Sequence, residues 1–406
     1  MVLLVGTMVL TAPLTAQVTM TLDADVADEV VRGFVSVEPF EVRLEALIEI
    51  DAFRVDWEIR DQDLGKEAQK QILAKVEALL IDKVAVTSGG DPLLFTGSEV
   101  RFVKFDPERG YLVDERETIP LGDALAGVTL VSTKRGVTEL ELEWNWFARG
   151  QERAVIEVTS AGRPAARYVT PENGRMSWRL DGELEAPALI EVPEAIWAKG
   201  GGMSAFHIIS LILLAGSAVI VFWKQEKAPR WIGLVAAVGL ALGFLGFKLK
   251  EPRVLVPEGE EIEELLYSLL RNTYHAFDFR DDSEIYDTLA ESVTGSLLER
   301  TFLEVRQSLE LESSGGPRVR VYEVSLRETE LLSRHWRVRD SFQVRASWVT
   351  IGEVTHWGHE HERTNRYEAE FNLLADEEHW RIQGLDLLNE ERVLQRVSRT
   401  VADPEG

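Results

Sequence analysis

The stretch THWGHEHERTNRYEAEF, from Thr355 to Phe371, decides how the last third of the chain is interpreted. From Trp357 to Leu373, every second residue belongs to a face that becomes more apolar along the chain, and the residues between them are mostly charged. A period of two with one apolar face predicts a β-strand that lines a core or a concave surface. The inward face consists of Trp357, His359, His361, Arg363, Asn365, Tyr367, Ala369, Phe371 and Leu373.

The stretch also contains three of the seven histidines in the chain. His359 and His361 are expected to point inward together, about 7 Å apart along the strand. Gly358 permits a β-bulge, which would turn His356 onto the same face. Because two or three imidazoles on one face can bind a divalent transition metal, His356, His359 and His361 form a candidate metal site.

The same strand predicts a polar ligand pocket as an alternative. Arg363 suits an anionic group in such a pocket, or it pairs with an acidic neighbour. Each imidazole can also be satisfied by a carboxylate or by water. No HExxH motif accompanies the histidines, so the pocket is favoured over the metal site. Its candidate residues are His359, His361, Arg363 and Tyr367, with Trp348 and Phe342 as walls.

Composition narrows the function classes. The sequence contains no GxSxG elbow, no P-loop and no GxGxxG motif after a strand. A net charge of −25 repels phosphate backbones, which argues against nucleic acid as a partner. The absence of cysteine excludes disulfides and thiolate-ligated metals. We therefore expect no catalysis and no cofactor, with a divalent transition metal at the histidines as the alternative.

The histidine-rich strand belongs to a domain predicted over residues 258–401. Its first part carries three amphipathic helical patterns, EEIEELLYSLLRNTYHAF, DDSEIYDTLAESV and GSLLERTFLEVRQSLEL. After the segment SSGGP the period changes to two, and Val319, Phe342 and Trp380 mark further strands. Helices followed by an antiparallel meander predict an α+β domain.

This order of elements, ending in a Trp-Arg-Ile strand at residues 380–382, resembles the NTF2-like superfamily of cone-shaped α+β domains. The resemblance covers the C-terminal domain only. That superfamily includes membrane-tethered assembly modules, ligand-binding domains and a minority of enzymes. The enzymes often use an Asp/His pair inside the cone, and no motif in this sequence identifies such a pair. The resemblance therefore bears on fold more than on function.

Two apolar runs precede this domain. Residues 204–223 carry no formal charge and can span a bilayer as a helix, and residues 231–247 just reach the necessary length. The link between them, residues 224–230, is basic, which favours the cytoplasm. Gly239 and Gly243 form a GxxxG spacing that closes the hairpin or joins two copies in a homo-oligomer. We expect a two-helix transmembrane hairpin over residues 204–247.

Residues 17–198 predict a β-rich domain. The segment EVRLEALIEI, residues 41–50, alternates, and its charged face, which includes Arg43 and Glu45, is expected in solvent. The segment FRVDWEIR, residues 53–60, predicts another strand, and residues 66–80 predict an amphipathic helix. The whole predicts a β-sandwich of immunoglobulin-like architecture without the cysteine pair.

Residues 1–16 predict a signal peptide, although no basic residue precedes the apolar run. Export of the N-terminal domain and a return through two spans would leave both large domains on the extracytoplasmic, periplasmic side. We therefore predict a membrane-anchored structural or interaction protein of a bacterial cell envelope, with a protein partner and no catalysis. The alternative is a small-ligand or metal-binding module, a metal-dependent hydrolase included, that uses the histidine-rich strand.

Overall fold

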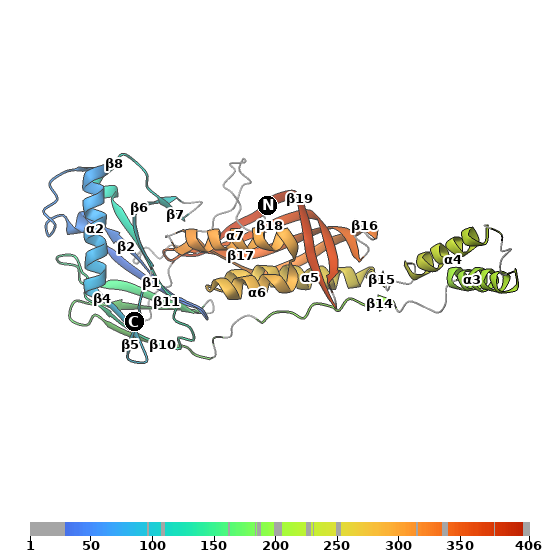
Figure 1. The fold of residues 1–406 in the computed structure, drawn as a ribbon. Coiled ribbons are helices and arrows are strands. Elements are labelled where there is room, and N and C mark those ends of the chain that lie inside the picture. Colours follow the sequence, from blue (N-terminus) through green and yellow to red (C-terminus); the bar gives the residue numbers. More distant parts are fainter. Residues whose placement is uncertain are drawn as a thin grey trace.

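The computed structural model describes residues 29–95, 97–106, 110–160, 163–182, 184, 188–198, 205–224, 229, 231–248, 253–313, 316–334, 340–376 and 378–400. The predicted signal peptide and most of the basic link lie outside these residues. Figure 1 shows a β-rich N-terminal domain at one end and the helices α3 (Ala205–Lys224) and α4 (Trp231–Lys248) at the other. The C-terminal domain lies between them, although it follows both in the sequence.

The N-terminal domain is built on a seven-stranded sheet with the order β12-β11-β1-β2-β9-β6-β7. The pair β1 and β11 is parallel, and the other pairs in this sheet are antiparallel. The strands are β1 (Val31–Val37), β2 (Val42–Glu49), β6 (Gly97–Asp106), β7 (Gly110–Val113), β9 (Leu125–Ser132), β11 (Ala154–Ser160) and β12 (Arg163–Val169).

A second layer covers one face of this sheet. It combines the helix α2 (Lys66–Lys83) with a four-stranded sheet in the order β13-β10-β4-β5. The main core fills the space between the layers, with Leu44 of β2, Val76 of α2 and Trp144 of β10 all at most 1% exposed. The strands of the second layer are β4 (Val84–Ser88), β5 (Asp91–Pro92), β10 (Glu139–Trp144) and β13 (Arg175–Arg179). A short pair, β3 (Asp63–Gly65) and β8 (Thr118–Pro120), lies beside α2.

The predicted helix is confirmed, and the strand predicted over residues 53–60 is wrong. The chain there forms a 3₁₀ helix, η1 (Ile50–Phe53), followed by turns. Phe53 is buried and stacks on Trp57, at 4.9 Å between ring centroids, but Val55 is 65% exposed. The apolar side chains of this segment therefore pack from a turn, with Phe53 against both Trp57 and Trp146, and none of the described strands pairs with it. A second 3₁₀ turn, η2 (Leu121–Asp123), packs against η1.

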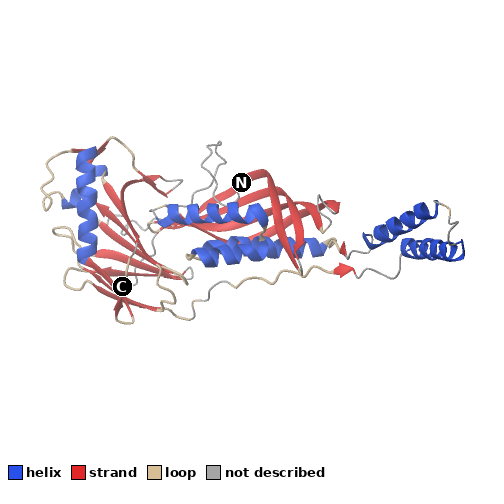
Figure 2. Ribbon diagram, viewed as in Figure 1, coloured by secondary structure: helices blue, strands red, loops and turns tan. Residues whose placement is uncertain are grey.

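The C-terminal domain confirms the predicted change from helices to strands. Three helices, α5 (Glu260–His275), α6 (Asp282–Ser292) and α7 (Gly295–Ser313), precede a meander in the order β16-β17-β18-β19. The helices lie along one side of the curved sheet (Figure 2). The strands are β16 (Arg318–Arg334), β17 (Ser341–His356), β18 (His359–Asp376) and β19 (His379–Thr400). A short 3₁₀ turn, η4 (Ala276–Asp278), follows α5.

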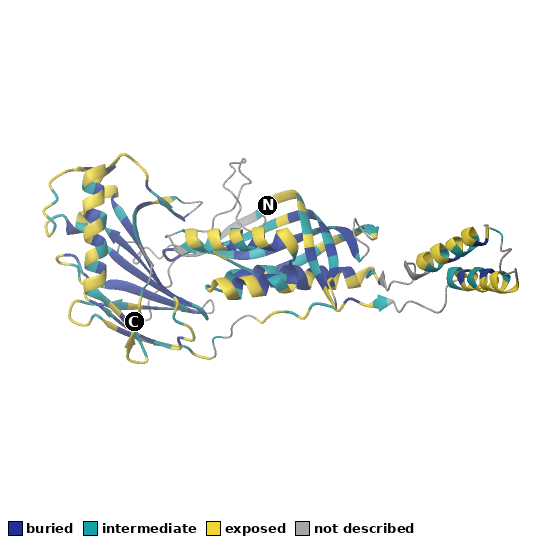
Figure 3. Ribbon diagram, in the orientation of Figure 1, coloured by how far each residue is buried: buried dark blue, intermediate teal, exposed yellow. Residues whose placement is uncertain are grey.

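The helices α3 and α4 pack against each other as a hairpin. A Cβ atom on Gly239 would lie 3.3 Å from Cβ of Leu213, and one on Gly243 would lie 2.8 Å from Oγ of Ser210. The GxxxG spacing therefore lets the two helices of one chain approach closely. Among the described residues, Ala205–Trp223 is the one helix long and apolar enough to cross a membrane, and the apolar part of α4, Trp231–Leu245, is shorter. Both helices expose most of their surface (Figure 3).

The segment before the hairpin runs along the C-terminal domain. The backbone N–H of Ile190 donates to the side chain of Asn272, whose Nδ2 donates to the Ile190 carbonyl, each at 2.8 Å. Farther on, β14 (Trp197–Ala198) pairs with β15 (Arg253–Val254), so the chain enters and leaves the hairpin at one place. The sequence VPEAIWAKGGGM, residues 192–203, predicts a short tether to the membrane, but residues 192–198 are part of this docked segment.

Candidate functional site

The histidine-rich stretch forms the tip of the β17–β18 hairpin. His356 pairs with His359 across a two-residue turn, in which Trp357 has φ 47° and Gly358 has φ 72°. Two left-handed residues are what a tight hairpin turn with the natural strand twist requires. The expectation that the strand continues through Trp357 with a bulge at Gly358 is therefore wrong. His356 lies on the neighbouring strand.

The tip is buried against the face of the seven-stranded sheet that the second layer leaves uncovered. Trp357 is 2% exposed and packs with Phe34, Leu47, Val103 and Tyr111, which form a separate small core. Its indole Nε1 donates to the Val128 carbonyl at 3.1 Å, and its backbone N–H donates to Glu45 Oε2 at 2.8 Å. We call this contact and the ion pairs beside it the interdomain joint.

Glycines make room for the tip. A Cβ atom on Gly127 of β9 would lie 2.6 Å from Cζ2 of Trp357, so only a glycine lets the indole lie flat on the strand. A Cβ atom on Gly358 would collide with the ring of Phe34, and its positive φ disfavours any side chain. The position of the tip is therefore determined by shape as well as by hydrogen bonds.

Each of the three histidines is part of the joint. The ring of His359 meets Phe105 edge-on at 5.6 Å and His361 at 4.4 Å between centroids. Burial lowers the pKa of His359 to about 4, and the neighbouring His361 adds to the effect. The ring of His356 stacks on Trp357 at 3.5 Å. Within the described residues, no group of three or more His, Cys, Asp or Glu side chains is arranged to hold a metal ion.

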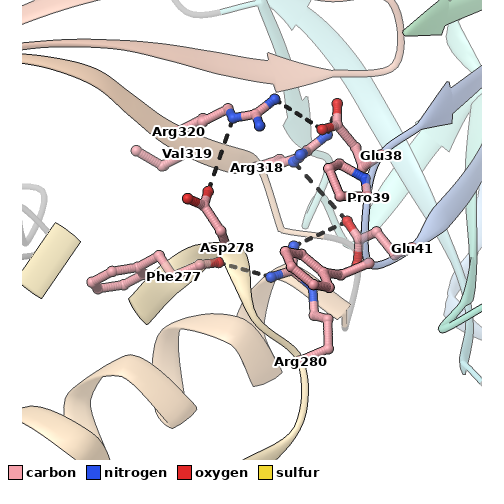
Figure 4. A pocket seen from close by; sticks show the side chains of 10 residues that line it. Glu38, Pro39, Glu41, Phe277, Asp278, Arg280, Arg318, Val319 and Arg320 are labelled. Carbon is pink, nitrogen blue, oxygen red and sulfur yellow. Dashed lines mark hydrogen bonds and ion pairs between the residues drawn. The ribbon is translucent and has the colours of Figure 1, made fainter. Parts of the chain in front are cut away.

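Beside the tip, the two domains share a buried ion-pair network, shown in Figure 4. The β1–β2 turn supplies Glu38 and Glu41. Arg280 binds Glu41 through two bonds, at 2.6 Å from Nε and 3.0 Å from Nη2. Glu38 binds Arg318 at 3.0 Å and Arg320 at 2.8 Å. Bidentate, charge-assisted pairs of this kind fix orientation as well as contributing energy.

The pKa values of the glutamates in the network depend on both their burial and the nearby arginines. Burial alone would raise the pKa of Glu41, but the charge and hydrogen bonds of Arg280 outweigh burial and lower the pKa to about 2. Burial raises the pKa of Glu312, at the end of α7, although Arg280 and Arg318 lie close to it. Arg43 of β2 adds bonds to Glu45 at 3.1 Å and to the Gly316 carbonyl at 2.9 Å.

Sequence patterns alone missed this network. The charged face of β2 was expected in solvent, but Glu41, Arg43 and Glu45 are all at most 4% exposed. Their partners in the other domain lie more than 230 positions away in the chain, as the separation of 239 between Glu41 and Arg280 shows. The only signal was charge complementarity: acidic residues at the β1–β2 turn and arginines at residues 280, 318 and 320.

The pocket predicted on the inner face of β18 is not brought together. Phe342 and Trp348 are completely buried in the C-terminal core, and Trp348 stacks on Tyr367 at 5.3 Å between centroids. These side chains fill the space that a ligand would need. Arg363 lies on β18 between His361 of the joint and Tyr367 of this core. Burial lowers the pKa of Arg363, and the nearby charge of Arg392 lowers it further. His359 faces the other domain instead, and the ring of His361 lies edge-on against that of His359.

Comparison with known proteins adds little. No protein-family model and no curated protein matches the chain. Among solved structures, the intermembrane space region of the chloroplast protein ARC6 is similar at 14% identity, over 33% of this chain and 98% of that one, with a TM-score of 0.26. A similarity this low assigns neither fold nor function to this chain.

Proposed function

We propose that this chain is a membrane-anchored structural protein of the cell envelope, whose two large domains act as one rigid unit that holds a protein partner near the bilayer. The observation that carries the proposal is the interdomain joint. In the joint, the clustered histidines, a buried tryptophan and the buried arginine–glutamate network all form a contact between the protein's own domains. A joint of this kind favours a fixed spacing between two binding surfaces over a reactive centre.

The anchoring part of the proposal rests on α3 and on the β14–β15 pair. The apolar length of Ala205–Trp223 matches a hydrocarbon core of about 30 Å. Because β14 and β15 pair directly, a hairpin of α3 and α4 would return the chain to the side that it left. Both large domains would then lie on one side, which we propose to be extracytoplasmic, following the signal peptide expected at residues 1–16.

For the C-terminal domain we propose membership of the NTF2-like superfamily, supported by three helices that precede and cover a long, curved four-stranded meander. Register shifts between β16 and β17 and between β18 and β19 supply the curvature of such a sheet. Membrane-tethered assembly modules within that superfamily agree with the structural role proposed here.

Metal analysis and melting of the full chain, purified in detergent, test this function against the metal- or ligand-binding alternative. We expect no stoichiometric transition metal, and we expect His359→Ala and His361→Ala to weaken the joint without changing metal content. Stoichiometric zinc, copper or nickel that is lost in both variants would overturn the proposal.

Carbonate extraction of membranes tests the anchor: the full chain should stay in the pellet, and its release would contradict anchoring.

A further inference from the structure

The β14–β15 ribbon carries an exposed apolar pair at the end of the C-terminal domain nearest α3 and α4 (Figure 1). Ile196 is 65% exposed and Leu255 is 53% exposed. The N–H of Leu255 donates to the Ile196 carbonyl at 2.7 Å, which places the two residues side by side. Their neighbours Ala195 and Val254 are buried in the C-terminal core. The ribbon therefore has one face in the core and one apolar face outside.

A groove runs from this pair to the start of α5. Proline rings and aliphatic side chains form much of its floor, and the buried Trp380 also lines it. The apolar lining consists of Pro193, Ile196, Val254, Leu255, Val256, Pro257, Leu265 and Trp380.

Carboxylates form the rim of the groove. Five glutamates line it against one basic side chain, Arg334, which pairs with Glu258. Glu260 and Glu261 lie in the first turn of α5, where acids stabilise the helix dipole. Glu194 and Glu264 have no such role, and within the described part of the chain neither forms an ion pair with a basic side chain. The rim is therefore strongly negative around an apolar floor.

We propose that this groove binds a cationic amphipathic segment of a membrane-protein partner, close to where that partner leaves the bilayer. Apolar side chains of the segment would cover Ile196 and Leu255, and its lysines or arginines would face the glutamate rim. This inference rests on the proposed membrane anchoring and names the class of partner.

The position of the groove favours such a partner. Ile196 lies 205 − 196 = 9 residues before the start of α3, so at most about 30 Å of extended chain separates it from that helix. A lipid surface fits less well, because the rim repels anionic headgroups. The basic link of the same chain follows Lys224, the last residue of the 20-residue helix α3, which is about 30 Å from the start of that helix.

The test uses the full chain in nanodiscs of zwitterionic lipid and a fluorescent peptide that alternates lysine pairs with leucine pairs. Peptide anisotropy, corrected with empty nanodiscs, should show binding that weakens as salt rises. Ile196→Ser/Leu255→Ser should raise Kd at least tenfold, and Glu194→Gln/Glu264→Gln should raise Kd and flatten the salt dependence. The control Leu94→Ser, at a 77% exposed leucine of the N-terminal domain, should bind like the parent chain.

Four results would overturn the inference. The first is an equal Kd for the parent chain and the Ile196/Leu255 variant, and the second is equal binding of a peptide with glutamine in place of lysine. The third is binding of the parent chain to anionic vesicles that is lost in the Ile196/Leu255 variant. The fourth is a dimer of the parent chain in ultracentrifugation that becomes a monomer in that variant. The last two would assign the groove to lipid or to a second copy. Failure of the membrane anchor would appear separately, as release of the chain by carbonate, whatever the peptide does.

Discussion

The two ends of the C-terminal domain treat apolar surface in opposite ways. At the tip end, Trp357 is 2% exposed, because the N-terminal sheet covers it. At the end nearest α3 and α4, Ile196 and Leu255 are more than half exposed on a ribbon that is otherwise well packed. Carboxylates lie around both places. Arginines bind those at the tip, whereas Glu194 and Glu264 are exposed and pair with no basic side chain within the described part of the chain.

This difference separates a surface that the protein covers itself from one that is free to bind a partner. The covered surface at the tip forms a fixed contact between domains, and an apolar surface left open is a candidate for a protein partner. The tip end therefore fixes the arrangement of the two domains, and the groove at the opposite end is where we expect a partner to bind. Variants at the joint should change domain arrangement and leave the groove intact.

The largest effect is expected from Trp357→Ala. Loss of a buried tryptophan costs about 3–5 kcal/mol, so the joint should open while both cores stay folded. Because the chain has no cysteine, spin labels at Leu94→Cys and Leu388→Cys report the distance between the domains. We expect a sharp distance in the parent chain and a broad one in the variant. The control Leu303→Ala, at a 60% exposed residue of α7, should stay sharp, and a sharp distance in Trp357→Ala would refute the role of the tip.

Arg280→Ala should cost somewhat less, about 3 kcal/mol, because it leaves Glu41 buried without its bidentate partner. Arg43 and Arg318 lie near enough to Glu41 to keep the cost at the lower end of the usual range. The matched control is Arg179→Ala, which removes an exposed pair with Glu139 and should cost at most about 1 kcal/mol. Calorimetric melting of the full chain measures both, and equal losses would show that the network does not stabilise the joint.

A pair of glycine variants isolates the shape of the tip. Gly358 and Gly89 both have positive φ, at 72° and 61°, so alanine costs about 1–2 kcal/mol in either place. Only at Gly358 would the new Cβ also collide with Phe34, whereas Gly89 has open space around it. Gly358→Ala should therefore destabilise the joint by about 1–3 kcal/mol more than Gly89→Ala. Equal effects in melting would mean that the tip can shift to accept a methyl group.

The smallest effect is a pH dependence. The pKa of His359 falls from 6.5 to about 4 in the closed joint, so the closed state holds His359 neutral, and protonation favours opening. The contribution of His359 is complete above pH 6.5 and is lost as pH falls toward 4. His361 and Tyr111 face the same ring, and the lowered pKa values of Glu38 and Glu41 act only below about pH 4.5. Spin-label distances between pH 7 and 5 should broaden in the parent chain and stay constant in His359→Gln.

Local patterns predicted much of the fold because they depend on neighbours in the chain. The amphipathic stripe at residues 66–80 and the change of period after residue 317 are short-range signals, and both are confirmed by α2 and by β16–β19. The segment at residues 53–60 misled because aromatic contacts in a turn imitate a period of two. The candidate site on β18 met the same limit, since alternation shows which side chains share a face and not what covers that face.

The amino-acid sequence by itself determined the α+β order of the C-terminal domain, the apolar helices before it and the inward face of β18, because periodicity and length act locally. Only the tertiary structure decided that the strand turns at Trp357, that the histidines lie between two domains, and that the charged face of β2 is buried. Those outcomes depend on contacts between residues more than 200 positions apart, such as Trp357 and Glu45, and complementarity over such distances leaves no periodic pattern in either segment.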